Sequence, residues 1–362
     1  MTRTVQAAVL ALLVAASPAA AQAVPDLEEI RQKTGLTAND RSRIQAYVQQ
    51  AVQAMVTNTD LDRHGIVAAR QRLLEEVQNT ENRTGAYRQA FVEEALPVLK
   101  KALEKAVSQS ARANVVMTLA GLQTIEAVPL LQSVLADDPY PASRYWAAKG
   151  LASLAPKIRQ RLEPRIERGI ADTIGKALQK PQPTLVLMPL FDAVGTFDHE
   201  RAHDVLADGL TRVAKDLDAS DPVVRRLVSE ANRSLERAYS REVRPDAKKE
   251  LLLAYAALCA HIMPPVGASP PPAGYGRLMA DLNASLEKIT GEDVGFESTD
   301  PLPLQQLSLL EWVERLARTK QIPRRPEMPA AVEEAVEEGR PGSGAAAGEA
   351  VGAGPSADKA GG

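Results

Sequence analysis

Apolar residues recur three or four positions apart along nearly the whole chain from Asp26 to about Lys320, and almost no stretch alternates apolar with polar residues. This spacing places apolar side chains on one face of an α-helix, whereas a half-buried β-strand would show alternation. Residues 39–57 illustrate the pattern, with Ile44, Val48 and Val52 on one face. Each such face needs a neighbouring helix to cover it. The sequence therefore predicts an all-α protein.

An internal repeat is the most specific feature of this pattern. The segment 94–103 recurs 32 positions later as 126–135, and Arg112 and Arg144 are separated by the same 32 positions. A single pair of amphipathic helices cannot bury its own apolar faces, so repeated pairs are typical of stacked arrays. The repeat therefore favours an array of helix pairs.

Residues 138–151 resemble the signature of HEAT-like repeats, in which an Asp-Pro pair precedes an arginine, two alanines and a leucine. Here these residues are Asp138-Pro139, Arg144, Ala147-Ala148 and Leu151, and Ala127–Leu131 resembles the start of the second helix of such a repeat. Asp and Pro both favour the first turn of a helix, so we expect Asp138-Pro139 to start one. The resemblance covers roughly residues 94–239 and implies an irregular α-α superhelix (solenoid). It also implies that the arginine bridges to an aspartate of a neighbouring turn.

The chain departs from the HEAT-like pattern in two ways. The 32-residue offset is shorter than the usual period of about 40 residues. In the unit from Glu163 to Phe197, Thr184-Leu185 stand where the arginine is expected. An unrelated helical bundle containing one duplicated phrase is the alternative architecture.

Changes in composition divide the chain into six parts. Arg3, the apolar run Val5–Ala16 and the small residues Ala19–Ala23 follow the order of a secretory signal. The run is too short to span a bilayer, which needs about 20 apolar residues; an uncleaved N-terminal anchor is the alternative. The predicted parts are a signal peptide (1–23), an N-terminal helical cap (24–90), a HEAT-like repeat region (91–263), a Pro/Gly-rich loop (264–276), C-terminal helices (277–322) and a disordered tail (323–362) containing one short segment of helical spacing, Ala331–Glu338.

One short motif matches a catalytic signature. Residues 199–203 read His-Glu-Arg-Ala-His, the H-E-x-x-H spacing of zinc-dependent metallopeptidases. On a helix this spacing puts two imidazoles on one face, where they can bind zinc while the glutamate acts as general base. A secreted zinc-dependent hydrolase using His199, Glu200 and His203 is therefore one candidate function.

The residues around the motif argue against zinc. Arg201 and Asp204 are charged where such enzymes usually carry uncharged residues, and no third ligand follows at a familiar spacing. We expect Asp198 to be the N-cap residue of this helix, with His199 in its exposed first turn. His203 would then lie at the edge of the apolar face, which is formed by Ala202, Leu206, Leu210, Val213 and Leu217. We therefore assign no catalytic, cofactor-binding or metal-binding residue.

The other chemically suggestive residues are weaker candidates. Cys259 lies in an apolar helical stretch and is predicted to be buried. His261, two residues later on the same helix, would point in another direction. Lys100, Lys101 and Lys105 form a basic cluster on one predicted helix, which is more typical of a solvated face than of a docking site.

Composition narrows the possible functions. Lys and Arg number 43 and Asp and Glu 46, which gives a net charge of −3 and argues against non-specific nucleic-acid binding. The single cysteine excludes an internal disulfide framework.

Three of the few aromatic residues, Tyr140, Tyr145 and Trp146, surround one predicted repeat turn and include a candidate anchor for a partner.

The sequence as a whole predicts an exported, non-catalytic protein that binds or scaffolds another protein in the periplasm or cell envelope. The surface of the stacked helix pairs would make the contact. We expect no cofactor, no nucleic acid and, after removal of the signal, no membrane span. The step from fold to function is an analogy with other helical arrays.

Overall fold

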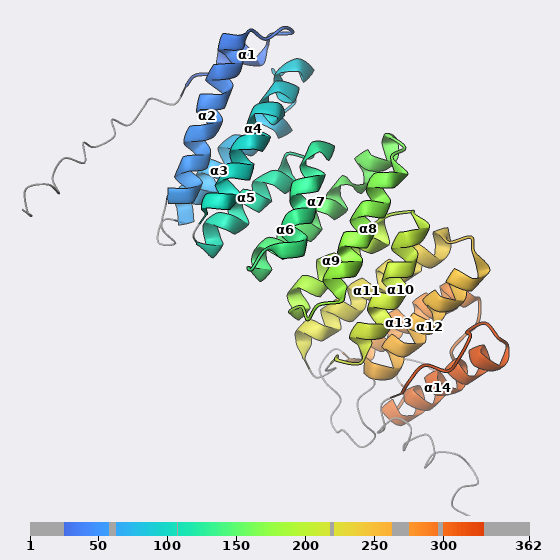
Figure 1. The fold of residues 1–362 in the computed structure, drawn as a ribbon. Helices are drawn as coiled ribbons and strands as arrows, with labels where there is room; N and C mark the ends of the chain where they lie inside the picture. The colour runs from blue at the N-terminus through green and yellow to red at the C-terminus, as the bar shows by residue number, and fades with distance from the viewer. Residues whose placement is uncertain are drawn as a thin grey trace, which may run out of the picture. The chain divides into compact units, whose positions relative to one another are not determined.

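The computed structural model describes residues 25–57, 63–106, 108–217, 221–262, 275–295 and 300–328. Within these ranges every regular element is a helix, which confirms the predicted all-α class (Figure 1). None of the helices described there has the length and apolar character needed to cross a bilayer. The predicted signal peptide, residues 264–274 of the predicted loop and the predicted tail from residue 329 lie outside the described residues.

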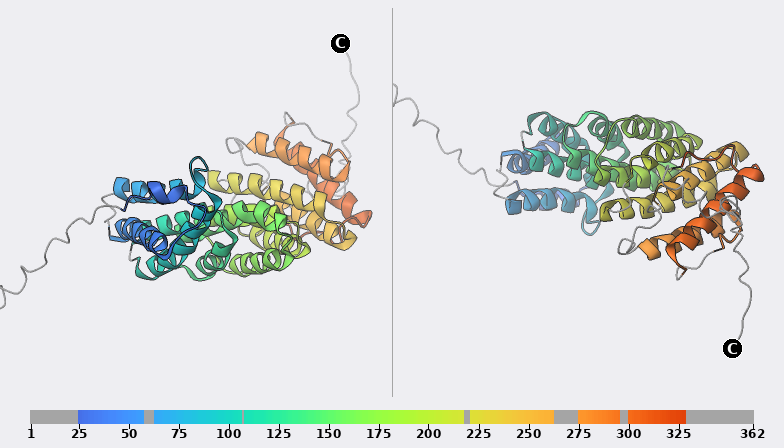
Figure 2. Two further views of the ribbon diagram at one scale, coloured as in Figure 1. Left: turned by 90° about the horizontal axis from the view of Figure 1, so that it is seen from above. Right: turned by 90° about the horizontal axis from the view of Figure 1, so that it is seen from below.

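The described residues up to 162 form one compact unit. Its most extensive contacts join α2 with α4 and α5 with α7, which are two places apart in chain order, and also the consecutive helices α2 with α3 and α6 with α7; α3 packs less extensively on α5. Figure 1 labels these helices, and Figure 2 shows the same part of the chain, in blue to green, from above and from below. The described elements are α1 (Glu28–Arg31), α2 (Ala38–Thr57), α3 (Arg63–Gln78), α4 (Gly85–Lys105), α5 (Gln109–Gly121), the 3₁₀ turn η1 (Ile125–Ala127), α6 (Val128–Asp137) and α7 (Pro141–Gln160).

Local sequence sets the helix ends of this unit. The Ser108 hydroxyl caps α5 by accepting a hydrogen bond from the backbone N–H of Ala111 at 3.1 Å. The prediction that Asp138 starts a helix is wrong, because Asp138 is the C-cap residue of α6 and Tyr140 is the N-cap residue of α7. Pro141 opens α7 instead, where the missing N–H of proline breaks no helical hydrogen bond.

The repeated phrase occupies different places in its two copies. Residues 94–103 lie inside α4, whereas residues 126–135 begin in η1 and continue into α6. The two arginines are equivalent, because Arg112 and Arg144 are each the fourth residue of their helix, α5 and α7. Of the apolar residues in the two phrases, Leu99, Val128 and Leu131 are buried and Leu96 is half-buried.

The described residues from 163 onward form a second compact unit. Here α10 packs on both α8 and α12, and α11 packs on both α9 and α13, so alternate helices form two layers. Helix α14 packs on α12, and its Trp312 and Leu316 are fully buried. The described helices are α8 (Pro164–Leu178), α9 (Thr184–Thr196), α10 (Glu200–Ala214), α11 (Pro222–Arg241), α12 (Pro245–Ile262), α13 (Tyr275–Thr290) and α14 (Leu302–Arg318).

A glycine allows α9 and α11 to approach closely. A Cβ atom added at Gly195 would lie 2.5 Å from Cβ and 2.8 Å from Cα of Ser234 on α11. Backbone atoms cannot rotate aside as the end of a long side chain can, so an added methyl group has to push the two helices apart. The packing of this layer therefore depends on glycine at position 195.

We expect Gly195→Ala to lower the free energy of unfolding by about 1–3 kcal/mol, the usual cost of overpacking a core. The better helix propensity of alanine, about 1 kcal/mol, reduces this loss only in part. Urea unfolding measures the change. Gly85→Ala is the matched control, because a Cβ atom there meets nothing within 4 Å. Equal stability of the two variants would contradict the close approach of α9 and α11.

Candidate functional site

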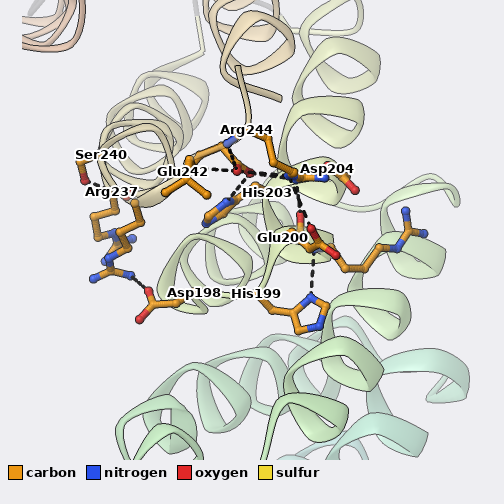
Figure 3. Close-up of polar contacts among 12 residues, drawn as sticks. Asp198, His199, Glu200, His203, Asp204, Arg237, Ser240, Glu242 and Arg244 are labelled. Atoms are coloured by element: carbon orange, nitrogen blue, oxygen red, sulfur yellow. Dashed lines mark hydrogen bonds and ion pairs between the residues drawn. The ribbon is translucent and has the colours of Figure 1, made fainter. Parts of the chain in front are cut away.

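The H-E-x-x-H segment lies at the start of α10, but its two histidines have different structural roles. The helix begins at Glu200, and His199 is the N-cap residue, whose Nδ1 accepts a hydrogen bond from the backbone N–H of Arg201 at 3.0 Å. The prediction that Asp198 is the N-cap residue is therefore wrong; the Asp198 carboxylate pairs with Arg241 at 2.6 Å. Because the backbone of His199 is extended, its imidazole does not share a helix face with His203 (Figure 3).

His203 is 3 % exposed and lies in the interior rather than at the predicted edge of the apolar face. Its Nδ1 is 2.9 Å from Oε2 of Glu242, the buried C-cap residue of α11. Arg244 donates two hydrogen bonds to the Glu242 carboxylate, at 3.1 and 2.8 Å, and a third to Asp204 at 2.8 Å. This cluster ties the start of α10 to the end of α11 (Figure 3).

The predicted apolar face of α10 is buried near the H-E-x-x-H motif but only half-buried toward the end of the helix. Ala202, Leu206 and Leu210 are buried. Val213 and Leu217, at the end of the helix and beyond it, are half-buried.

This arrangement does not match a zinc site of the H-E-x-x-H type. Because Nδ1 of His199 accepts a hydrogen bond, the proton of the neutral ring is on Nε2, which then has no lone pair to offer a metal. The Glu200 side chain is 65 % exposed and lies 3.6 Å from Arg244. Within the described ranges, no group of three or more His, Cys, Asp or Glu residues is placed to hold a metal ion.

Cys259 is completely buried in α12, as predicted. Burial raises the pKa of its thiol well above the ordinary value. A thiol that stays protonated is a poor nucleophile. The ring of His261 contacts the carbonyl of Ala257 on its own helix, with Nδ1 at 3.0 Å from the oxygen, so the two residues do not form a reactive pair.

The two surface clusters singled out in the sequence lie in the first unit. Lys100, Lys101 and Lys105 are exposed on α4, and two of them border a groove of about 360 Å³ between α2 and α4. The rings of Tyr145 and Trp146 are in edge contact at 5.3 Å, with the Lys149 ammonium 5.5 and 5.4 Å from their centroids. Tyr140, Tyr145 and Trp146 are all half-buried, so none is a fully exposed anchor.

A larger groove, which the sequence did not reveal, lies in the second unit between α9, α11 and α13. Its volume is about 970 Å³. Basic side chains predominate among its charged residues, and apolar positions are contributed by α9, by α13 and by Pro222 at the start of α11. Arg225, Arg226 and Arg233 come from α11 and Arg277 from α13; the acidic residues are Glu230 and Asp281, and Met188, Leu278 and Ala284 are apolar. We refer to it as the arginine groove.

Buried hydrogen bonds hold the floor of the arginine groove together. The side-chain amide of Asn232 on α11 donates to Oγ of Ser285 on α13 at 2.9 Å. The hydroxyl of Tyr255 on α12 donates to the carbonyl oxygen of the same amide. All three side chains are buried, so the two walls are fixed relative to each other before any ligand binds.

The arginine groove carries unbalanced positive charge. Arg226 and Arg277 are exposed and have no ion-pair partner in the part of the chain that the structure describes. Arg233 pairs with Glu230 at 2.7 Å. Burial, together with the nearby Asp192 carboxylate, raises the pKa of Glu230 above its ordinary value. The groove can therefore accept carboxylates from a ligand, and arginine is well suited to bind them in a bidentate manner.

Comparison with known proteins gave no match: no family model, no curated protein and no solved structure is similar to this chain.

Proposed function

We propose that this chain is a non-catalytic protein-binding protein of HEAT-like α-solenoid architecture, and that the arginine groove binds an acidic segment of its partner. The observation that carries the proposal is that two exposed arginines, Arg226 and Arg277, line one groove from two helices and have no ion-pair partner among the described residues. Its placement in the periplasm or cell envelope depends on the amino-terminal sequence pattern alone.

The solenoid part of the proposal is supported by the packing of alternate helices within each unit. It is supported further by one arginine–aspartate bridge of the kind that the HEAT-like resemblance implies. Arg112 on α5 donates to the buried carboxylate of Asp138, just after α6, at 2.5 Å. In this proposal residues 24–90 are the terminal cap of the array.

An acidic polypeptide fits the arginine groove better than a simple anion does. Two exposed guanidinium groups provide sites for carboxylates, and Met188 and Leu278 contribute apolar surface to the same groove. A phosphate or a nucleic-acid backbone would leave these apolar positions unused. Since interface affinity comes from a few buried anchors surrounded by complementary charge, an acidic segment with interspersed apolar residues uses the whole surface.

The zinc-hydrolase alternative is not carried forward. Of the three residues it requires, His199 caps a helix, His203 is hydrogen-bonded to Glu242, and Glu200 lies near Arg244. No second function is favoured by a separate observation.

We expect a fluorescent peptide of three Ala-Val-Glu-Glu repeats to bind the full chain, and its Ala-Val-Lys-Lys counterpart to bind at least about tenfold more weakly, because like charges repel at the groove. Fluorescence anisotropy measures both affinities. Binding of the acidic peptide should weaken with rising salt concentration, since exposed charges are screened.

The double charge reversal Arg226→Glu/Arg277→Glu should abolish binding of the acidic peptide. Arg165→Glu/Arg212→Glu is the matched control, because both arginines are exposed on α8 and α10 of the same unit and do not line the groove. Equal loss of binding in the two double variants, or equal affinity for the acidic and basic peptides, would contradict the proposed function.

A further inference from the structure

We propose that an acidic segment of this chain, residues 333–338, occupies the arginine groove in cis and competes there with the acidic segment of a partner. This inference depends on the proposed function, because it names the regulation of the same groove. It is built from the attachment point of the segment, its reach and its pattern of charge.

The last described stretch of the chain contacts the second unit at the end of α10. Glu327 forms an ion pair with Lys215, the C-cap residue of α10. Helices α10 and α11 are antiparallel, because His203 near the start of α10 contacts Glu242 at the end of α11. The end of α10 therefore lies at the same end of the pair as the start of α11, where Pro222, Arg225 and Arg226 line the groove.

The linker between the attachment point and the acidic segment is short. Glu333 is five residues after Met328, the last described residue. Five extended residues span at most about 17 Å. The proposal requires this linker to carry Glu333 from the end of α10, past the start of α11, to Arg226.

The pattern of residues in the segment complements the groove. Glu333 and Glu334 are followed four positions later by Glu337 and Glu338, and Val332 and Val336 have the same spacing. Helical spacing, which the sequence predicts here, would place the valines on one face with carboxylates on both sides of them. The groove offers the corresponding surface, with apolar Met188 and Leu278 beside Arg226 and Arg277.

Tethering makes this contact effective even if the bare segment binds weakly. A short linker gives an effective concentration on the order of millimolar. A segment whose dissociation constant in trans is on the order of 0.1 mM would then fill the groove about nine-tenths of the time and reduce the affinity for a partner about tenfold.

The test compares the full chain with a variant in which Glu333, Glu334, Glu337 and Glu338 are all changed to glutamine. The probe is the fluorescent peptide of three Ala-Val-Glu-Glu repeats. We expect the variant to bind this peptide about tenfold more tightly than the unmodified chain, because the competing carboxylates are gone. Addition of Arg226→Glu/Arg277→Glu to the variant should abolish the gain.

The outcomes separate this inference from the proposed function. Equal affinity of the peptide for the unmodified chain and the glutamine variant would overturn the inference and leave the proposed function standing. No binding to either chain would overturn the proposed function and the inference together.

Disulfide trapping reports the contact directly. With Ser229→Cys in the groove and Val336→Cys in the segment, we expect an intramolecular disulfide to form in a glutathione buffer at least about tenfold faster than with Ser229→Cys and Val351→Cys, because docking holds the first pair together. The native Cys259 is completely buried and does not compete. Equal rates for the two pairs would contradict docking of the segment.

Discussion

Glu76→Gln is expected to lower the free energy of unfolding by about 3–5 kcal/mol, the usual cost of breaking a buried ion pair by removing one partner. Glu76 on α3 is 3 % exposed and accepts four hydrogen bonds. Arg31 donates two of these at 2.6 and 3.0 Å, Arg83 donates one at 3.1 Å, and the hydroxyl of Tyr87 donates one at 2.9 Å. A single carboxylate therefore joins α1, the turn before α4, and α4 itself.

The physical reason for the large effect is charge. Burial by itself raises the pKa of Glu76, but the hydrogen bonds from Arg31, Arg83 and Tyr87 outweigh it and hold that pKa below its ordinary value. Glutamine has no charge and presents an N–H₂ group to donors, so the two guanidinium groups lose their counter-ion while they remain partly buried.

Urea unfolding of the full chain measures the effect of Glu76→Gln. Glu75→Gln is the matched control, because Glu75 is the preceding residue of the same helix and is exposed. It should change stability by no more than about 0.5 kcal/mol, as is usual for surface substitutions. A loss of similar size in the two variants would show that the cluster around Glu76 contributes little.

The helices could be predicted because the signal for each is local. Apolar spacing alone placed Ile44, Val48 and Val52 on the buried face of α2, and all three are buried. Helix caps were harder, because several side chains can fill the same role. His199 caps α10 through its ring nitrogen, although the neighbouring Asp198 is the more common type of cap.

The charged clusters could not be predicted because their members are far apart in sequence. His203 and Glu242 are separated by 39 positions, and no pattern around either residue points to the other. The arginine groove combines Arg226 with Arg277 on a different helix. Arginines at 225, 226 and 233 place positive charge on one helix, which is the only local sign of the groove. These arginines line a groove together with Arg277 because α13 packs beside α11, and the sequence gives no local indication of that packing.

The Glu242 cluster is expected to make stability depend on pH in the acid range. Burial by itself raises the pKa of Glu242, but hydrogen bonds from Arg244 and from His203 outweigh it and lower that pKa from 4.5 to about 2. A carboxyl group whose pKa is lowered by folding stabilises the folded state fully above its unfolded pKa. Its contribution is lost as the pH falls from about 4.5 toward 2, because the unfolded chain binds the proton first.

We expect Glu242→Gln to cost about 3 kcal/mol at pH 7, since a shift of about 2.5 pH units corresponds to that free energy. The difference between the unmodified chain and the variant should shrink steadily between pH 5 and pH 2.5 in urea unfolding experiments. The exposed Glu250 on α12 provides the control: Glu250→Gln should leave stability nearly unchanged at every pH.

The groups facing Glu242 are His203 and Arg244, and Asp204 is paired with Arg244. A destabilisation by Glu242→Gln that stays constant from pH 7 to pH 3 would mean that the carboxylate acts by its shape and hydrogen bonds and not by its charge.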